Sequence, residues 1–200
     1  MKIVGVYLAA GKSSRMGKNK LALPFKNTTV GNIALETALH SSLDNIYIMI
    51  KGDSHWISSE IIKNPKCSVI QCPSAHLGQS ETIKCALRTV QAYGADAILV
   101  MLADQPFIPF HMIEEIIACK KKTPSLHFVA ASFKNIISPP VLLSAAMFPK
   151  ISNLSGDTGA KVLLRGDYLK KGKILPYNQL EYFQDIDTKE DYDKLLCGIK

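Results

Sequence analysis

Apolar and polar residues alternate along the chain in two patterns, one typical of buried strands and the other of amphipathic helices. Short apolar runs, several of them rich in β-branched residues, predict strands at residues 2–8, 45–50, 68–72, 95–102, 128–132 and 141–143. Apolar residues at helical spacing predict helices at residues 29–41, 80–93, 109–120, 157–164 and 189–196. Strands and helices therefore follow one another through most of the sequence.

This alternation determines the expected fold class. Strand–helix–strand units bring parallel strands together with helices on both faces, which predicts an α/β fold: a three-layer α/β/α sandwich with a mostly parallel sheet. Residues 2–8 are apolar throughout, as expected of a strand covered on both faces, and the still more apolar residues 95–102 are expected to be central. No repeat, low-complexity tract or linker interrupts residues 1–200, so we expect one domain.

Composition and charge restrict the class of partner. The apolar content of 47% is ordinary for a chain that buries a core, and the net charge of +7 favours an anionic partner. Nucleic acid is disfavoured because the sequence has no zinc-finger spacing, RNA-binding aromatic motif or dense basic block. No apolar stretch is long enough to span a membrane, so a membrane partner is not expected. Five cysteines without a C-x-x-C pair favour reduced thiols and a cytoplasmic location.

The first predicted strand runs directly into a turn of small residues and cations at residues 9–20. Glycines let backbone N–H groups approach phosphate oxygens, and Lys and Arg neutralise their charge, so this turn predicts a polyphosphate site. A dinucleotide fingerprint is excluded because Gly5, Gly11 and Gly17 are too far apart. A P-loop is excluded because Val6 stands where its first glycine is required.

Residues 8–21 read Leu-Ala-Ala-Gly-x-Ser-x-Arg-Met-Gly-x-x-Lys-Leu, which resembles the signature loop of the MobA-like NTP transferases. These nucleotidyltransferases act on sugar phosphates and on the molybdenum cofactor, and the resemblance implies their Rossmann-like nucleotide-diphospho-sugar transferase fold. It also implies nucleotide-binding roles for Leu8, Ala9, Ala10, Gly11, Ser13, Arg15, Gly17 and Lys20. The Ala9-Ala10 pair with Ser13 resembles the molybdenum cofactor cytidylyltransferase branch, whereas the guanylyltransferase branch more often has glycine where Ala10 stands.

Two cations of this loop are expected to be catalytic. Arg15 can contact two phosphate oxygens at once, and Lys20 can neutralise the α- or β-phosphate as charge shifts during transfer. For Lys12 and Lys18, an assisting role and a place on the solvated surface are equally open.

An aspartate, Asp104, follows the most apolar strand. It would lie at the carboxyl edge of the sheet, where open α/β sheets bind ligands, and a carboxylate there can hold Mg²⁺ together with phosphate oxygens and water. The alternative is an aspartate that only stabilises a turn. Residues 102–106, Leu-Ala-Asp-Gln-Pro, resemble the metal motif of the same family, which favours a catalytic, metal-binding Asp104.

A second source of carboxylates is Asp-Ile-Asp-Thr-Lys-Glu-Asp at residues 185–191, which resembles the Asp-Thr-Pro-Glu-Asp element of the family. Alternation along an extended segment puts Asp185 and Asp187 on one side. Either could share the metal with Asp104, and we favour Asp187. An Asp-Thr pair that only caps the last helix is an equally good interpretation, with Glu190 and Asp191 as first-turn partners of the helix dipole.

Two further segments extend the resemblance. Gly78 and Ser80 match the segment that lies against base and ribose, although Ser80 is equally suited to cap the helix at residues 80–93. Gly156, Asp157 and Lys161 match a turn on the acceptor side. The cytidylyltransferases usually carry Gly-x-Pro near residues 137–141, where this chain has Ile-Ser-Pro-Pro-Val. The acceptor is therefore the least constrained part of the assignment.

Taken with the residues above, the resemblance implies Mg²⁺-dependent transfer of CMP from CTP to molybdopterin or its molybdenum form, with release of pyrophosphate. A guanylyltransferase that uses GTP and a sugar-phosphate nucleotidyltransferase are alternatives from the same class. A non-catalytic carrier that inserts the molybdenum cofactor into a hydroxylase is the alternative from a different class. A molybdenum hydroxylase that receives the product is the expected protein partner.

Overall fold

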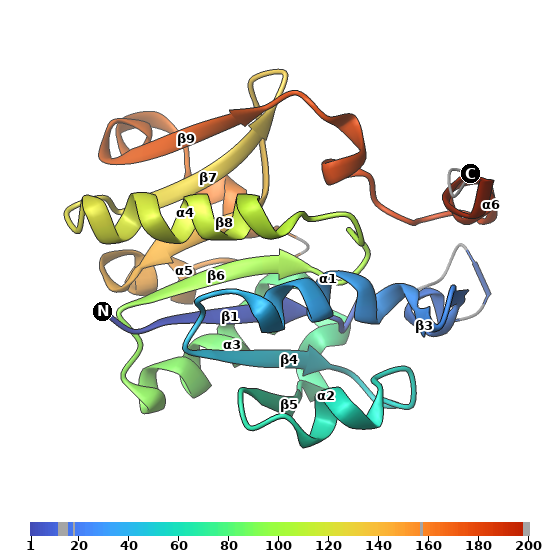
Figure 1. Ribbon diagram of the computed structural model, residues 1–200. Helices are drawn as coiled ribbons and strands as arrows, with labels where there is room; N and C mark the ends of the chain where they lie inside the picture. The colour runs from blue at the N-terminus through green and yellow to red at the C-terminus, as the bar shows by residue number, and fades with distance from the viewer. Residues whose placement is uncertain (12–15, 18, 157, 198–200) are drawn as a thin grey trace.

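A seven-stranded sheet forms the centre of the computed structural model, which describes residues 1–11, 16–17, 19–156 and 158–197 (Figure 1). The strands lie in the order β5-β4-β1-β6-β8-β7-β9. Their bounds are Ile3–Leu8 (β1), Asn45–Ile50 (β4), Cys67–Gln71 (β5), Ala97–Leu102 (β6), Phe128–Phe133 (β7), Ile136–Ser144 (β8) and Gly172–Tyr177 (β9). A separate small hairpin pairs β2 (Pro24–Phe25) with β3 (Thr28–Thr29).

The sheet is mostly parallel, as the sequence predicts. β1 pairs in parallel with both β4 and β6, and only β8 runs antiparallel to its neighbours. In the register, Leu8 at the end of β1 lies between Met49 of β4 and Leu102 of β6. The carboxyl ends of these three strands therefore meet at one edge, and the chain segments that follow β1 and β6 emerge side by side.

Helices cover both faces of the sheet (Figure 1). Their bounds are Val30–His40 (α1), Ser59–Lys63 (α2), Gln79–Tyr93 (α3), Phe110–Lys122 (α4), Phe148–Ser152 (α5) and Lys189–Cys197 (α6). Alternate β1 residues enter two different cores: Tyr7 packs with α1 and α4 on one face, and Val6 packs with α3 and α5 on the other. This arrangement confirms the three-layer α/β/α sandwich.

The last helix lies beside the small hairpin, away from the main layers (Figure 1). Leu195 of α6 packs with Phe25, Val30 and Ile186 in a third, smaller cluster. The Tyr192 hydroxyl donates a hydrogen bond of 2.6 Å to the backbone carbonyl of Pro24. The C-terminal segment is therefore held against the chain that follows the first loop.

The predicted elements agree with the structure within two residues at most ends, with two exceptions. The helix expected at residues 157–164 is a short 3₁₀ helix at Ala160–Leu163, and the strand expected at residues 141–143 is the longer β8. β8 begins after a hairpin turn in which Lys134 and Asn135 have positive φ. The pairing with β7 skips from Val141 to Ser138, so the two intervening prolines need donate no ladder hydrogen bond.

Five helices and strands were not expected from the sequence: α2, α5, β9 and the two-residue strands β2 and β3. Both helices have only five residues, too few for a helical period to be recognised, and β9 is an edge strand with half of its residues exposed. In the described part of the chain, no helix has the length and apolar character needed to cross a membrane.

Candidate active site

Lys20 is placed by a short 3₁₀ turn, Lys20–Ala22, a few residues after the first loop. The Asn19 side chain accepts a hydrogen bond of 3.1 Å from the backbone N–H of Leu21, which caps the turn. The Leu21 side chain is buried in the core on the α1 face. Lys20 is itself only 7% exposed, so its ammonium group is confined to the carboxyl edge of the sheet.

Asp104 is held where β6 ends beside β1. The backbone N–H of Ala103 donates to the carbonyl of Leu8 at 3.1 Å, so the pairing with β1 continues one residue beyond the strand. Ala103 is buried and Gln105 is 2% exposed, which fixes the backbone on both sides of the aspartate. Asp104 therefore projects from a rigid turn, as the sequence predicts for an aspartate after a buried strand.

The segment at residues 185–187 returns to this turn from the other end of the chain. The backbone N–H of Ile186 donates to the Asp104 carbonyl at 2.9 Å, and the Ile186 side chain is buried in the third cluster. Asp185 accepts a hydrogen bond of 2.8 Å from the Gln105 amide, and Asp187 contacts Lys20. The carboxylates of Asp185 and Asp187 thus lie at the same edge of the sheet as Asp104, and the Ile186 side chain between them anchors the segment on the other side.

One ammonium group joins the two ends of the chain. Lys20 Nζ lies 2.7 Å from Asp104 Oδ2 and 2.7 Å from Asp187 Oδ1. Burial, the largest single influence, would lower the pKa of Lys20, but the two carboxylates together raise that pKa above its ordinary value. Lys20 is therefore fully charged at neutral pH, and it contacts two carboxylates 84 and 167 residues away in sequence.

The neighbouring Asp185 differs in its environment. Burial and then the charge of Asp104 raise the pKa of the Asp185 carboxyl, and the hydrogen bond from Gln105 opposes this rise. Asp185 is thus less readily ionised than an ordinary aspartate. Of the two aspartates in this segment, Asp187 presents its oxygen to the same cation as Asp104.

At the start of α6, some residues of this segment cap the helix and a neighbouring residue belongs to the candidate site. Thr188 Oγ1 accepts from the backbone N–H of Asp191 at 3.1 Å, and Asp191 Oδ2 accepts from the backbone N–H of Thr188 at 2.9 Å. This reciprocal pair is a capping box. The capping interpretation is thus confirmed for Thr188, whose partner is Asp191, while the Asp187 carboxylate contacts Lys20.

The described part of the first loop agrees with a tight turn. Leu8, Ala9 and Ala10 are buried, and Ala9 donates its backbone N–H to the Met49 carbonyl at 2.9 Å. Gly17 has a φ of +62°, a left-handed conformation that favours glycine. Ser13, Arg15 and Asp157, together with Lys12 and Lys18, lie outside the described residues.

The expectation that Ser80 caps α3 is wrong, because the helix begins one residue earlier and Gly78 is its N-cap, with a φ of +123°. The buried Ser80 hydroxyl instead donates a hydrogen bond of 2.6 Å to the carbonyl of Gly156. Nearby, Gly159 lies so close to the Gln79 side chain that a Cβ there would collide with it. The segment expected against the base and the turn expected at the acceptor are therefore packed together.

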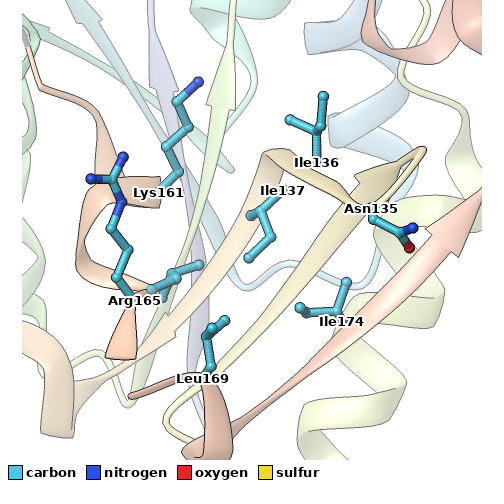
Figure 2. Close-up of a pocket in the computed structure, with 8 residues that line it drawn as sticks. Asn135, Ile136, Ile137, Lys161, Arg165, Leu169 and Ile174 are labelled. Carbon is cyan, nitrogen blue, oxygen red and sulfur yellow. The ribbon is translucent and has the colours of Figure 1, made fainter. Parts of the chain in front are cut away.

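Lys161 lines a groove of about 380 Å³ (Figure 2). Lys161 and Arg165 stand along one side, and Ile137 and Ile174 lie across from them. The remaining lining residues are Asn135, Ile136, Leu164 and Leu169. The groove combines two cations with an apolar wall, which suits an anion that carries an apolar body.

The carboxylates fit a divalent cation by the chemistry of their oxygens. Among the described residues no group of three or more His, Cys, Asp or Glu side chains is arranged to hold a metal ion. Asp104 and Asp187 nevertheless present two oxygens to one cation, the ammonium of Lys20. Mg²⁺ usually takes one or two protein carboxylates and completes its shell with phosphate and water, so this pair is sufficient.

The family model for the MobA-like NTP transferase domain matches residues 5–173, from the first strand to the beginning of β9. The chain belongs to this family. As a MobA-like NTP transferase it is a nucleotidyltransferase, and both Lys20 and Asp104 fall within the matched residues. Asp185 and Asp187 lie beyond them.

Relatives of this MobA-like NTP transferase match it over nearly its whole length. The purine catabolism protein PucB of Bacillus subtilis (strain 168) is 36% identical, covering 96% of this chain and 94% of that protein. The nicotine blue oxidoreductase of Paenarthrobacter nicotinovorans is 27% identical (97% and 96%), and the molybdenum cofactor cytidylyltransferase of Escherichia coli (strain K12) is 23% identical (94% and 92%). The crystal structure of Rv0371c from Mycobacterium tuberculosis H37Rv superimposes with a TM-score of 0.80, at 25% identity and 98% coverage of both chains.

Two residues of this MobA-like NTP transferase site were not singled out from the sequence. Gln105 contacts Asp185 through its buried amide, and its place next to Asp104 was a usable signal. Arg165 lines the groove with Lys161, and the two cations are four residues apart. That spacing would have been informative only if the segment had been recognised as one wall of a groove.

Proposed function

We propose that this protein transfers CMP from CTP to the terminal phosphate of molybdopterin or its molybdenum form, with release of pyrophosphate. The observation that carries the proposal is the cluster of Lys20, Asp104 and Asp187 at the carboxyl edge of β1 and β6. The cluster lies beside the end of the strand that leads into the first loop, where a nucleotide would place its phosphates.

The reaction needs no covalent intermediate on the protein. An oxygen of the acceptor phosphate attacks the α-phosphorus in line, the new P–O bond forms, and the bond to the leaving pyrophosphate breaks with its electron pair on pyrophosphate. Catalysis then consists of positioning and charge neutralisation. Lys20 and Arg15 would hold the phosphates and stabilise the charge that develops on the leaving group.

Asp104 and Asp187 would hold the divalent cation, expected to be Mg²⁺, with Asp185 as the alternative to Asp187. When bound, the cation supplies positive charge at the phosphate oxygens. Two carboxylates that already face one cationic group support this assignment. The backbone pairing of Ile186 with Asp104 keeps the two donors at a constant separation.

The assignment of the base and the assignment of the acceptor rest on separate observations. The Ala9-Ala10 pair supports CTP. The relatives include both a molybdenum cofactor cytidylyltransferase and a molybdenum cofactor guanylyltransferase, so the choice of base rests on this pair alone. Gly78 would give the base and ribose room, and Ser80 would act through its hold on Gly156. Gly156, Asp157 and Lys161 would contact the acceptor, and the groove beside Lys161 suits a phosphorylated heterocycle.

The expected partner is a cytoplasmic molybdenum hydroxylase that receives the product. The relative named a purine catabolism protein supports a role in a catabolic pathway. The relative named an oxidoreductase also concerns the choice of protein partner, because it matches this chain over nearly its whole length.

Pyrophosphate release with Mg²⁺ and molybdopterin, measured in parallel with CTP and GTP, tests the proposal. Release with CTP alone supports the cytidylyltransferase. Release with GTP alone keeps the mechanism and contradicts the interpretation of the Ala9-Ala10 pair. No release with either nucleotide, from folded protein and active acceptor, would favour another phosphorylated acceptor or a carrier function.

The groove makes a separate prediction about the acceptor. Arg165→Ala and Lys161→Ala should each raise the KM for the acceptor about tenfold, because each removes one charge-assisted hydrogen bond to an anion. The KM for the nucleotide should change little. Lys170→Ala is the matched control, since Lys170 is an exposed cation of the same segment that does not line the groove. A rise in the nucleotide KM alone would indicate that the groove binds the nucleotide and not the acceptor.

A further inference from the structure

The ammonium group of Lys20 contacts the same carboxylate oxygens that a divalent cation would need. It lies 2.7 Å from one oxygen of Asp104 and 2.7 Å from one oxygen of Asp187. The Lys20 side chain is 9% exposed, while those of Asp104 and Asp187 are 25% and 40% exposed. Lys20 therefore reaches the two carboxylates from the protein interior, and the carboxylates have their remaining surface towards solvent.

A divalent cation bound to these two oxygens would stand beside the ammonium group. Mg²⁺ sits about 2.1 Å from each carboxylate oxygen it binds. Two like charges within a few ångströms repel one another strongly where water is partly excluded. Lys20 must therefore leave at least one of these oxygens before a divalent cation can take both.

Lys20 gives up two close ion contacts when it leaves these carboxylates. For an ammonium group this deeply buried, another anion must compensate for that loss. The phosphates of a nucleotide supply the replacement, since the first loop brings them to the same edge of the sheet. With phosphates present, Lys20 keeps an anionic partner and the two carboxylates become available.

We propose that Lys20 couples cation binding to nucleotide binding by competing for Asp104 and Asp187 until phosphates draw it away. The nucleotide half of the proposal rests on the proposed function, whereas the competition rests on the contacts alone. Because coupling between two ligands is reciprocal, a bound cation also favours the nucleotide. The protein thus binds a divalent cation weakly until the nucleotide is present.

The competition is tested by the affinity for Mn²⁺ without any nucleotide, measured from the electron paramagnetic resonance signal of free Mn²⁺. Lys20→Met removes the charge and keeps a side chain of similar length. We expect it to bind Mn²⁺ about tenfold more tightly than the wild-type protein, within the usual range of coupling between sites. Lys63→Met is the matched control, because it changes the net charge equally at the end of α2 and should leave the affinity unchanged.

Two further measurements show that the gain belongs to this site. Adding Asp104→Asn to Lys20→Met should abolish the gain in Mn²⁺ affinity. Mn²⁺ should also raise the Tm of Lys20→Met more than that of the wild-type protein, because a ligand stabilises the folded state according to its affinity. If Lys20→Met does not fold, Lys20→Gln serves in its place.

Equal or weaker Mn²⁺ binding by a folded Lys20 variant would overturn the proposal, and so would a gain that survives Asp104→Asn. These results do not depend on which nucleotide or acceptor the protein uses. A failure of pyrophosphate release with unchanged Mn²⁺ behaviour would count against the proposed function and leave the competition intact. The two proposals can therefore fail separately.

Discussion

Asp104→Asn should lower the rate of pyrophosphate release about a thousandfold while the protein stays folded. The substitution keeps the shape of the side chain but removes the charge that would hold the cation at the transferred phosphate. It also removes one of the two carboxylates that neutralise Lys20. Steady-state release of pyrophosphate at saturating nucleotide and Mg²⁺ gives the rate, and circular dichroism with the Tm establishes the fold.

The two aspartates of residues 185–187 provide the matched comparison for Asp104. Asp187→Asn should reduce the rate by about a hundredfold or more, since Asp187 shares its cation with Asp104. Asp185→Asn should reduce it by less than about tenfold, since the Gln105 amide still has an oxygen to bond. Near-normal activity of Asp104→Asn would eliminate the metal assignment, and a greater loss in Asp185→Asn than in Asp187→Asn would exchange the roles of the pair.

Ile186→Ala should lower both the stability and the activity of the protein. Ile186 is 3% exposed in the cluster with Phe25, Val30 and Leu195, so its truncation should reduce the free energy of unfolding by about 2 kcal/mol. The same side chain anchors the segment that carries Asp187. We therefore expect the rate of pyrophosphate release to fall about tenfold, from less accurate positioning of that carboxylate.

Ile62→Ala is the control for this prediction, because Ile62 lies in α2 and is 50% exposed. It removes the same atoms, and its effect on the free energy of unfolding should stay within about 0.5 kcal/mol. Urea unfolding of both variants gives the stabilities, and activity well below the unfolding midpoint gives the rates. A stability loss in Ile186→Ala without any change in rate would show that Ile186 stabilises the fold but does not position Asp187 for catalysis.

Much of the fold could be predicted from local pattern. The runs that became β1, β4 and β6 are nearly continuous apolar segments, and such runs have one stable place, in the middle of a sheet covered on both faces. The short α5 and the exposed β9 escaped prediction because neither has a period or an apolar run of its own. Packing against a sheet that already exists stabilises both, which no local window can represent.

The candidate site divides in the same way. Asp104 was predictable because a polar residue directly after a buried strand must emerge at the carboxyl edge. The cap of α3 was not, because the helix begins at Gln79 and the Ser80 hydroxyl instead bonds the carbonyl of Gly156, 76 residues away. A side chain caps its own helix only when no group from a distant segment takes its hydrogen bond.

By itself, the sequence determined the α/β class, the central strands and the two segments that carry the carboxylates, and it predicts a phosphate site at the first loop. These properties depend on the order of residue types along short stretches, because local sterics and the burial of apolar side chains decide them. The tertiary structure alone decided that Lys20, Asp104 and Asp187 meet at one point and that Arg165 joins Lys161 in a groove. The contacts of Lys20 with Asp187 exist because α6 and Ile186 return the end of the chain to its beginning, and packing between distant segments sets such a return.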